Sequence, residues 1–321
     1  MNLCAIGTGA ITKSMLAEFS RSDILHVTAI YSRKEETGRA MAAEFGIEKV
    51  YTSMEAMLAD PSIDMVYVAS PNSVHYSQTK AALLAGKHVI CEKPFVPTVA
   101  EAEELIALAK EKGLFLFEAI TTAHHPHYRY VKENLSSLGN LKMICATFCQ
   151  FSSRYPALLA GKAAPVLDHA FAGGALMDIN LYNIHFVVGL FGAPESVRYF
   201  ANRHHTGVDT SGMLILEYKD FLCQCVGAKD CSARNGVQII GEEGHMEITP
   251  SSSNCQNVSL HLRKQEAVSV NLPENPWYYE VQDISRIVAA GDYDFCYRAL
   301  ETSRTVVDVL EKARKYAGFD F

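Results

Sequence analysis

The chain has 321 residues, 49% of them hydrophobic and 20% charged, which is enough apolar material for two ordinary domain cores. The formal net charge of −7, and the lack of an apolar run near the roughly 20 residues of a membrane span, argue against nucleic acid and membrane as partners. The nine cysteines, an odd number without metal-ligand spacing, argue against a disulfide framework and favour a reducing, cytoplasmic location.

The first part of the chain alternates apolar strands with amphipathic helices. Strands are predicted over residues 2–6, 25–31, 65–69, 88–91 and 114–118, and helices over residues 11–19, 37–45, 54–58, 74–84 and 99–112. This alternation predicts an α/β domain with a doubly wound parallel sheet, a dinucleotide-binding Rossmann domain at residues 1–121.

After residue 122 the strand-like segments are no longer regularly interleaved with helices. Strands are predicted over residues 143–151, 196–202, 211–218, 221–226, 237–240 and 259–263, and helices over residues 128–135, 174–190, 276–290 and 297–317. The polar residues 251–256 predict a hairpin turn or a surface loop. The pattern indicates an α+β domain at residues 122–321, with a large, mostly antiparallel open sheet and closing helices at 276–317.

A glycine-rich turn lies between the first strand and the first helix. In the G-x-G-x-x-G/A pattern, the first glycine allows the tight turn, the second lets a diphosphate approach the backbone, and the helix N-terminus supplies amide donors. Here Thr12 replaces the third small residue, which weakens helix packing but leaves the phosphate contact. A purely structural turn is the alternative. The residues expected to contact a dinucleotide here are Gly7, Thr8, Gly9, Ala10 and Ile11.

The end of the second strand indicates which nicotinamide nucleotide is bound. A turn that prefers NAD usually carries Asp or Glu there for the ribose 2′-hydroxyl, whereas this chain has Tyr31, Ser32, Arg33 and Lys34. A hydroxyl and two cations suit a 2′-phosphate, so we expect NADP, with contacts from Ser32 and Arg33. A solvated basic turn balanced by the two following glutamates is the alternative, and NAD is the alternative cofactor.

Two further segments identify a family. Residues 69–75 read Ala-Ser-Pro-Asn-Ser-Val-His, and residues 85–94 read Ala-Gly-Lys-His-Val-Ile-Cys-Glu-Lys-Pro. They resemble the A-T-P-N-x-x-H and A-G-K-H-V-x-x-E-K-P segments of the glucose-fructose oxidoreductase and inositol dehydrogenase family (Gfo/Idh/MocA), and the resemblance continues through residues 117–119 and 173–182. It implies a Rossmann domain followed by an open sheet that often mediates dimers, so a homodimer or higher homo-oligomer is expected. It also implies cofactor contacts from Ser70, Pro71, Asn72, His75, Glu92 and Lys93.

Lys93 is the expected acid/base residue. It lies just past the end of a parallel strand, where doubly wound folds place their ligands, and Pro94 fixes the turn. The positive charge of an oxidised nicotinamide would disfavour the ammonium form, so the amine could accept a hydroxyl proton. The resemblance assigns Lys93 this catalytic role, with Glu92 orienting the site. A surface lysine on a loop is the alternative.

The helix predicted over residues 174–190 places Asp178, Tyr182 and His185 at i, i+4 and i+7, on one stripe. Many family members carry His at the i+4 position, whereas the branch similar to dihydrodiol dehydrogenase and xylose dehydrogenase carries Tyr, as here. As catalytic residues, Tyr182 would hydrogen-bond the reacting oxygen or relay a proton with Lys93, and Asp178 would hold Lys93 or a substrate hydroxyl. A paired Asp, a core Tyr and a core His are the alternatives.

Two histidine-containing segments complete the candidates. Residues 204–210, His-His-Thr-Gly-Val-Asp-Thr, are similar to a stretch of dihydrodiol dehydrogenase-like proteins. Residues 124–127, His-His-Pro-His, invite a metal interpretation, but they lack a carboxylate or thiolate partner, so we expect a loop lining the pocket and no metal. His125 and His185 are therefore candidate substrate contacts.

Together these features predict hydride transfer between NADP and a hydroxyl-bearing carbon of a sugar, polyol or vicinal diol, with Lys93 moving the hydroxyl proton. One alternative is a regulatory protein that binds NAD(P) without catalysis. Another is an enzyme that keeps its cofactor tightly bound and recycles it.

Overall fold

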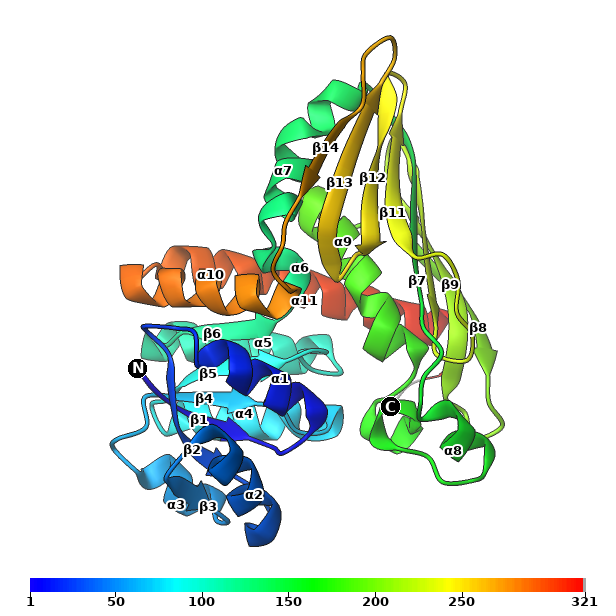
Figure 1. The fold of residues 1–321 in the computed structure, drawn as a ribbon. Coiled ribbons are helices and arrows are strands. Elements are labelled where there is room, and N and C mark those ends of the chain that lie inside the picture. The colour runs from blue at the N-terminus through cyan, green and yellow to red at the C-terminus, as the bar shows by residue number, and fades with distance from the viewer. Residues whose placement is uncertain (320–321) are drawn as a thin grey trace. The chain divides into compact units, whose positions relative to one another are not determined.

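The computed structural model describes residues 1–319, and these form two compact units (Figure 1). Unit 1 comprises Met1–Ala119 together with Trp277–Arg304, and unit 2 comprises Ile120–Pro276 and the chain from Thr305 onward. The sequence-based division after residue 121 leaves both closing helices in the second domain. The structure differs because residues 277–304 pack into the core of unit 1.

Unit 1 is the doubly wound parallel sheet that the sequence predicts. Its strand order is β3-β2-β1-β4-β5-β6, and every pair is parallel. The strands are β1 (Asn2–Ile6), β2 (His26–Tyr31), β3 (Lys49–Tyr51), β4 (Met65–Val68), β5 (His88–Glu92) and β6 (Leu116–Ala119). The helices are α1 (Ala10–Phe19), α2 (Glu35–Phe45), α3 (Met54–Ala59), α4 (His75–Leu84), α5 (Val99–Lys112), α10 (Pro276–Ala290) and the first half of α11 (Tyr293–Tyr316), whose residues from Thr305 onward belong to unit 2. A short 3₁₀ turn lies at Asn72–Val74. The strand order reverses direction between β1 and β4, which is where such folds bind ligands.

The closing helices join unit 1 through apolar side chains. Val281, Ile284 and Ile287 of α10 are fully buried in the same core as the strands of this sheet. Tyr293, the first residue of α11, stacks on Phe115 with ring centroids 4.0 Å apart. These contacts connect segments far apart in sequence, so local patterning does not reveal them.

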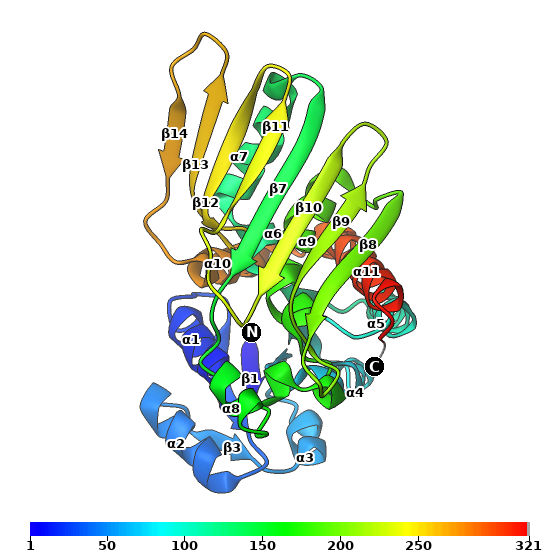
Figure 2. The same cartoon turned by 90° about the vertical axis from the view of Figure 1, so that its right-hand side faces the viewer.

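Unit 2 is built on an eight-stranded sheet in the order β14-β13-β12-β11-β7-β10-β9-β8 (Figure 2). All pairs are antiparallel except β7 with β10, which confirms the predicted mostly antiparallel sheet. The strands are β7 (Leu141–Cys149), β8 (Ser196–Arg203), β9 (Asp209–Glu217), β10 (Leu222–Ala228), β11 (Gly236–Gly241), β12 (Gly244–Ser251), β13 (Asn254–Leu262) and β14 (Val268–Asn271). Within the polar residues 251–256, Ser252 and Ser253 form the β12–β13 hairpin turn, and the other four residues belong to the two strands.

Helices cover one face of this sheet. They are α7 (Pro126–Asn134), α9 (Leu181–Phe191) and the C-terminal part of α11, which share one buried core with the sheet. The short α6 (Thr121–His124) precedes α7, and α8 (Tyr155–Leu159) packs in a separate small cluster with Leu167 and Val208. Short 3₁₀ turns lie at Leu135–Leu138, Pro165–Leu167 and His169–Phe171. Figure 1 shows α7 and α9 on one side of the sheet, and among the described residues no helix lies on the other side. His169–Phe191 is apolar and long enough to cross a membrane, but 72% of its most apolar window is buried inside the protein, which is typical of a core helix.

The predicted helix at residues 174–190 contains one irregular turn. Leu176–Asn180 is π-helical, and the α-helical part, α9, begins only at Leu181. A π turn spaces side chains differently from an α turn, so the stripe expected for Asp178, Tyr182 and His185 is interrupted at its first member. Such turns are frequent at functional sites.

Candidate active site

In the glycine turn after β1, the backbone at Gly7 is closely packed, whereas the backbone at Gly9 is open. Gly7 has a φ of +110°, and a Cβ there would overlap the carbonyl oxygen of Ala69, so only glycine fits. A Cβ at Gly9, in contrast, would meet nothing within 4 Å. Among the described residues, no side chain caps the following α1 and no acidic residue lies in its first turn. The amide donors and the positive end of the helix dipole are therefore available to an anionic group.

In the basic turn after β2, the two residues predicted to contact the cofactor, Ser32 and Arg33, lie in different environments. Ser32 is buried, its hydroxyl shares a hydrogen bond with Thr37 (2.8 Å), and it accepts the amide of Lys34 (3.3 Å), so it shapes the start of α2. Arg33 is exposed. Glu35 pairs with Arg39 one turn along α2, at 2.6 Å. The exposed cations of this turn, Arg33 and Lys34, are thus the groups suited to a phosphate.

His75 connects the turn after β4 with the turn after β5. Its Nδ1 lies 2.9 Å from the carbonyl oxygen of Pro94, and its Nε2 lies 2.9 Å from that of Ser70. The ring is almost completely buried, and burial lowers the pKa of His75. A neutral imidazole carries a single N–H, so His75 donates to one of the two carbonyl oxygens and packs against the other, between the turns that carry Ser70 and Lys93. Pro71 and Asn72, on the turn itself, are half-buried.

Lys93 is half-buried directly after β5, and a buried carboxyl group precedes it. Glu92 accepts hydrogen bonds from the Tyr67 hydroxyl (2.6 Å) and from the Lys93 amide (3.3 Å). Burial raises the pKa of Glu92 to about 7, although Tyr67 and the Lys93 charge act in the opposite direction. On the neighbouring strand, Glu118 accepts the amide of Phe95 at 3.0 Å.

A third buried carboxyl group belongs to this cluster, and the sequence analysis missed it. Glu280 of α10 is 1% exposed, burial raises its pKa well above the usual range, and the charges of Glu92 and Glu118 act in the same direction. The signal that could have revealed it is a glutamate on the apolar face of α10, four residues before the buried Ile284. Three carboxyl groups so close together in a dry interior cannot all ionise at neutral pH.

In unit 2, the π turn places Asp178 against a lysine that the sequence analysis also missed. Asp178 forms an ion pair with Lys229, the residue after β10, and both side chains are largely buried, with 18% and 12% of their surface exposed. The sequence analysis expected Lys93 or a substrate hydroxyl as the partner. Tyr182 is half-buried, with its ring 5.8 Å from that of Phe148. The sequence signal that could have identified Lys229 is its position directly after a buried strand.

The two histidines expected to contact the substrate, His125 and His185, are buried. His125 is 2% exposed, its Nδ1 accepts the amide of His127 at the start of α7 (3.3 Å), and burial lowers its pKa to about 4. His127 contacts the carbonyl oxygen of Cys255 through Nδ1 (2.8 Å), and His185 is 4% exposed on α9. Within residues 1–319, no group of three or more His, Cys, Asp or Glu side chains could hold a metal ion.

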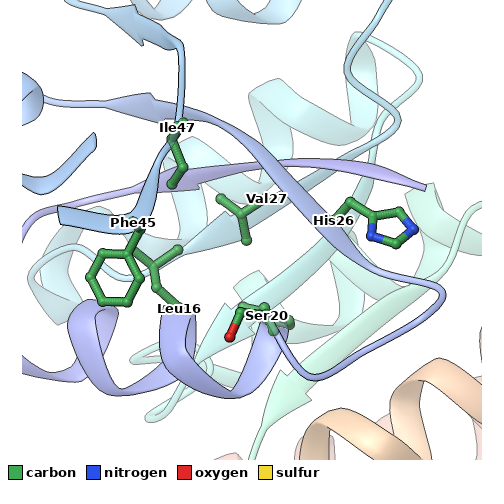
Figure 3. A pocket seen from close by; sticks show the side chains of 7 residues that line it. Leu16, Ser20, His26, Val27, Phe45 and Ile47 are labelled. Carbon is green, nitrogen blue, oxygen red and sulfur yellow. The ribbon is translucent and has the colours of Figure 1, made fainter. Parts of the chain in front are cut away.

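Unit 1 also contains a small cavity away from these residues. Its volume is about 190 Å³, and Figure 3 shows that its walls come from α1, β2 and the end of α2: Leu16, Phe19, Ser20, His26, Val27, Phe45 and Ile47. His26 begins β2, whereas the glycine turn follows the other end of the paired strand β1. The cavity therefore lies at the edge of the sheet opposite the predicted cofactor residues.

Comparison with known proteins gives matches along the whole chain. The family described as "Oxidoreductase family, NAD-binding Rossmann fold" matches residues 1–120, and "GFO/IDH/MocA C-terminal domain" matches residues 128–247. The uncharacterized oxidoreductase YgjR of Escherichia coli is 34% identical over 100% of this chain and 98% of its own length. The scyllo-inositol 2-dehydrogenase (NADP(+)) IolU of Bacillus subtilis is 32% identical, covering 98% and 96%.

The more distant relatives include another dehydrogenase and a reductase of known structure. The trans-1,2-dihydrobenzene-1,2-diol dehydrogenase of Sus scrofa is 28% identical over 92% of this chain and 90% of its own length. Among solved structures, the 3-ketoreductase KijD10 of Actinomadura kijaniata, in an open conformation with TDP-benzene and NADP, superposes with a TM-score of 0.83. It is 25% identical and covers 98% of this chain and 96% of that one.

Proposed function

Because the chain belongs to the GFO/IDH/MocA family of oxidoreductases, we propose that it transfers a hydride between NADP and a hydroxyl-bearing carbon of a sugar, polyol or vicinal diol. The observation that carries the proposal is the position of Lys93. It follows β5 at the carboxyl edge of the parallel sheet, with the buried Glu92 directly behind it.

The residues of unit 1 fit NADP. When bound, the nicotinamide ring accepts or supplies the hydride. The open space at Gly9 and the uncapped N-terminus of α1 suit a diphosphate, and Gly7 permits the turn that exposes them. The exposed guanidinium of Arg33 suits a 2′-phosphate, which an acidic residue would repel.

Lys93 holds or accepts the substrate hydroxyl proton in this proposal. Its charge and that of Glu92 are coupled, because the Lys93 ammonium favours the ionised form of the carboxyl group. Glu92 has a pKa of about 7, so its charge, and with it the electrostatic field at Lys93, can change near neutral pH. Glu92 and His75 hold the turn, and Lys93 moves the proton.

Unit 2 supplies hydrogen-bonding groups for the substrate. We assign Tyr182 to the reacting oxygen and Asp178 to a substrate hydroxyl. The Lys229 ammonium balances the Asp178 carboxylate, so the pair carries no net charge, which suits an uncharged polyol better than an acid. His125 and His185 are weaker candidates for substrate contacts because both are buried.

The test compares Lys93→Ala with Lys112→Ala, an exposed lysine at the end of α5. With sugars, polyols and diols as substrates, Lys93→Ala should lower turnover by roughly two to four orders of magnitude, the usual effect of removing a general acid/base. Calorimetry should find NADP binding largely intact in Lys93→Ala and unchanged in Lys112→Ala. Wild-type turnover in Lys93→Ala would contradict the proposal. NADP binding without turnover of any substrate would favour a regulatory protein, and nucleotide that copurifies would favour the recycling enzyme.

We further propose that two copies associate through the uncovered face of the eight-stranded sheet. Large apolar side chains are about half exposed on it: Met143, Phe200, Met213 and Leu222. Several are cross-strand neighbours, since Met143 pairs with Leu222, and Met213 pairs with Phe200 and with Val226. A contiguous apolar face of this kind is typical of a protein interface.

A cytoplasmic location also remains our proposal. All nine cysteines are free thiols, including Cys223 and Cys225, whose sulfur atoms lie 3.8 Å apart without bonding. Cys231 alone is exposed. Unpaired thiols in such number suit a reducing compartment.

A further inference from the structure

The segment His204–Thr210 has no role in the function proposed above, yet it contains a completely buried carboxylate, that of Asp209. Asp209 is the first residue of β9 and is 0% exposed. One of its oxygens, Oδ2, accepts two hydrogen bonds, from the Leu176 amide (2.7 Å) and from the Tyr199 hydroxyl (2.7 Å). The first of these donors belongs to the helix that carries Asp178.

The Asp209 carboxylate occupies the place of a missing N-cap side chain. Helical structure begins at Ala175, and the carbonyl oxygen of Gly174 accepts the first helical bond, from the Asp178 amide (3.0 Å). Gly174 therefore stands at the cap position, where Ser, Thr, Asp or Asn normally accepts the amide of the second or third helical residue. It has no side chain to do so, and a Cβ there would overlap Asp209 Oδ1.

The sheet also holds the other end of the π turn. Asn180 donates its side-chain amide to the carbonyl oxygen of Cys225 on β10 (3.1 Å), and Lys229 after the same strand pairs with Asp178. A Cβ at Gly227 would overlap Asn180, so the turn lies directly on the strand. The start of β9 and the end of β10 therefore fix both ends of the turn that precedes Tyr182.

We propose that Asp209 is a positioning residue: it caps the helix from a separate strand and thereby sets the positions of Asp178 and Tyr182 for the substrate. Asp209 itself touches neither substrate nor cofactor. A negative charge at this helix end is also favoured by the helix dipole. The part of the proposal that concerns the substrate rests on the function proposed above, whereas the cap itself does not.

Three variants test the proposal. Asp209→Ala removes the acceptor, Asp209→Asn keeps one oxygen for both donors, and Tyr199→Phe removes the other donor while leaving the helix bond. In Asp209→Ala, amide exchange at Leu176 should accelerate about five- to tenfold, the usual effect of losing an N-cap. The kcat should fall and the KM for the polyol should rise by a similar factor, while NADP affinity stays unchanged. Asp209→Asn and Tyr199→Phe should retain nearly wild-type exchange and kinetics.

Unchanged exchange at Leu176 in Asp209→Ala would overturn the proposal, and so would a Tyr199→Phe variant that reproduces the full kinetic loss. If Asp209→Ala does not fold, Asp209→Asn provides the test. The proposed cap needs only a hydrogen-bond acceptor, so the loss of both amide-exchange protection and activity in Asp209→Asn would contradict the proposal. If the wild-type protein turns over no polyol, the proposed function fails, and the exchange comparison still decides whether Asp209 caps the helix.

Discussion

Replacing Glu92 with glutamine should change the pH dependence of stability in a defined direction. The folded protein keeps the Glu92 proton up to a pH of about 7, because burial raises the pKa from the ordinary 4.5. In the unfolded chain the same group ionises near 4.5, so between these two values the folded state binds more protons. Folding stability from this group is therefore complete below about pH 4.5 and is lost as the pH rises through about 7.

The size of the effect follows from the shift. One pKa unit corresponds to about 1.4 kcal/mol, so the rise from 4.5 to about 7 corresponds to a loss of about 3 kcal/mol of unfolding free energy. Glutamine is neutral at every pH, has almost the same shape and still accepts the Tyr67 hydroxyl. Glu92→Gln should therefore be more stable than the wild type above neutral pH by up to about 3 kcal/mol, and the difference should vanish in mild acid.

Urea unfolding of the nucleotide-free protein, followed by circular dichroism across the acidic to mildly alkaline range, measures this difference. Glu111→Gln, at an exposed position on α5, controls for the loss of one carboxylate from the surface. A stability difference between wild type and Glu92→Gln that stays constant with pH, or that grows toward acid, would refute the assignment of Glu92 as a carboxyl group held neutral by burial.

Three further outcomes are expected. Gly9→Ala should lower the unfolding free energy of the free protein by only about 1 kcal/mol, the effect of losing glycine at a helix start, but should weaken NADP binding at least about tenfold in calorimetry. If the variant binds NADP as tightly as the wild type, no phosphate approaches this backbone. Arg33→Ala should weaken NADP binding about tenfold and leave NAD binding unchanged, whereas the control Arg39→Ala should affect neither. If Arg33→Ala weakens the binding of both nucleotides equally, Arg33 does not contact a 2′-phosphate. Met213→Asp should convert an oligomer to a monomer in light scattering, whereas Leu84→Asp, at an equally exposed site in unit 1, should not. A wild-type protein that is already monomeric would rule out association through the sheet.

Local patterning accounts for most of unit 1. The apolar run of β1 ends at Gly7, and the alternation of strands and helices that follows is enough to predict the doubly wound sheet. The three-residue strand β3 was missed because so short a segment carries no period. In unit 2, β12 and β14 were both missed; β14 reads Val-Ser-Val-Asn and does alternate, but four residues on an exposed edge strand are too few to establish a period.

The candidate site is less predictable because its geometry depends on long-range contacts. Nothing in the sequence Leu-Met-Asp-Ile-Asn distinguishes a π turn from an α turn; the distinction coincides with contacts to Asp209 and to β10, which lie more than thirty residues away. Glu280 joins the carboxyl cluster only because α10 returns to unit 1 from the far end of the chain. The motifs thus indicate which residues matter, and the tertiary structure determines what each one contacts.

The single exposed thiol gives the protein a natural labelling position. Cys231 follows Lys229 by two residues, whereas the other eight thiols are shielded to various degrees by packing. A maleimide dye would accordingly react first with Cys231. Its emission would report on the surroundings of the Asp178–Lys229 pair in the otherwise unmodified enzyme, without any cysteine having to be introduced or removed.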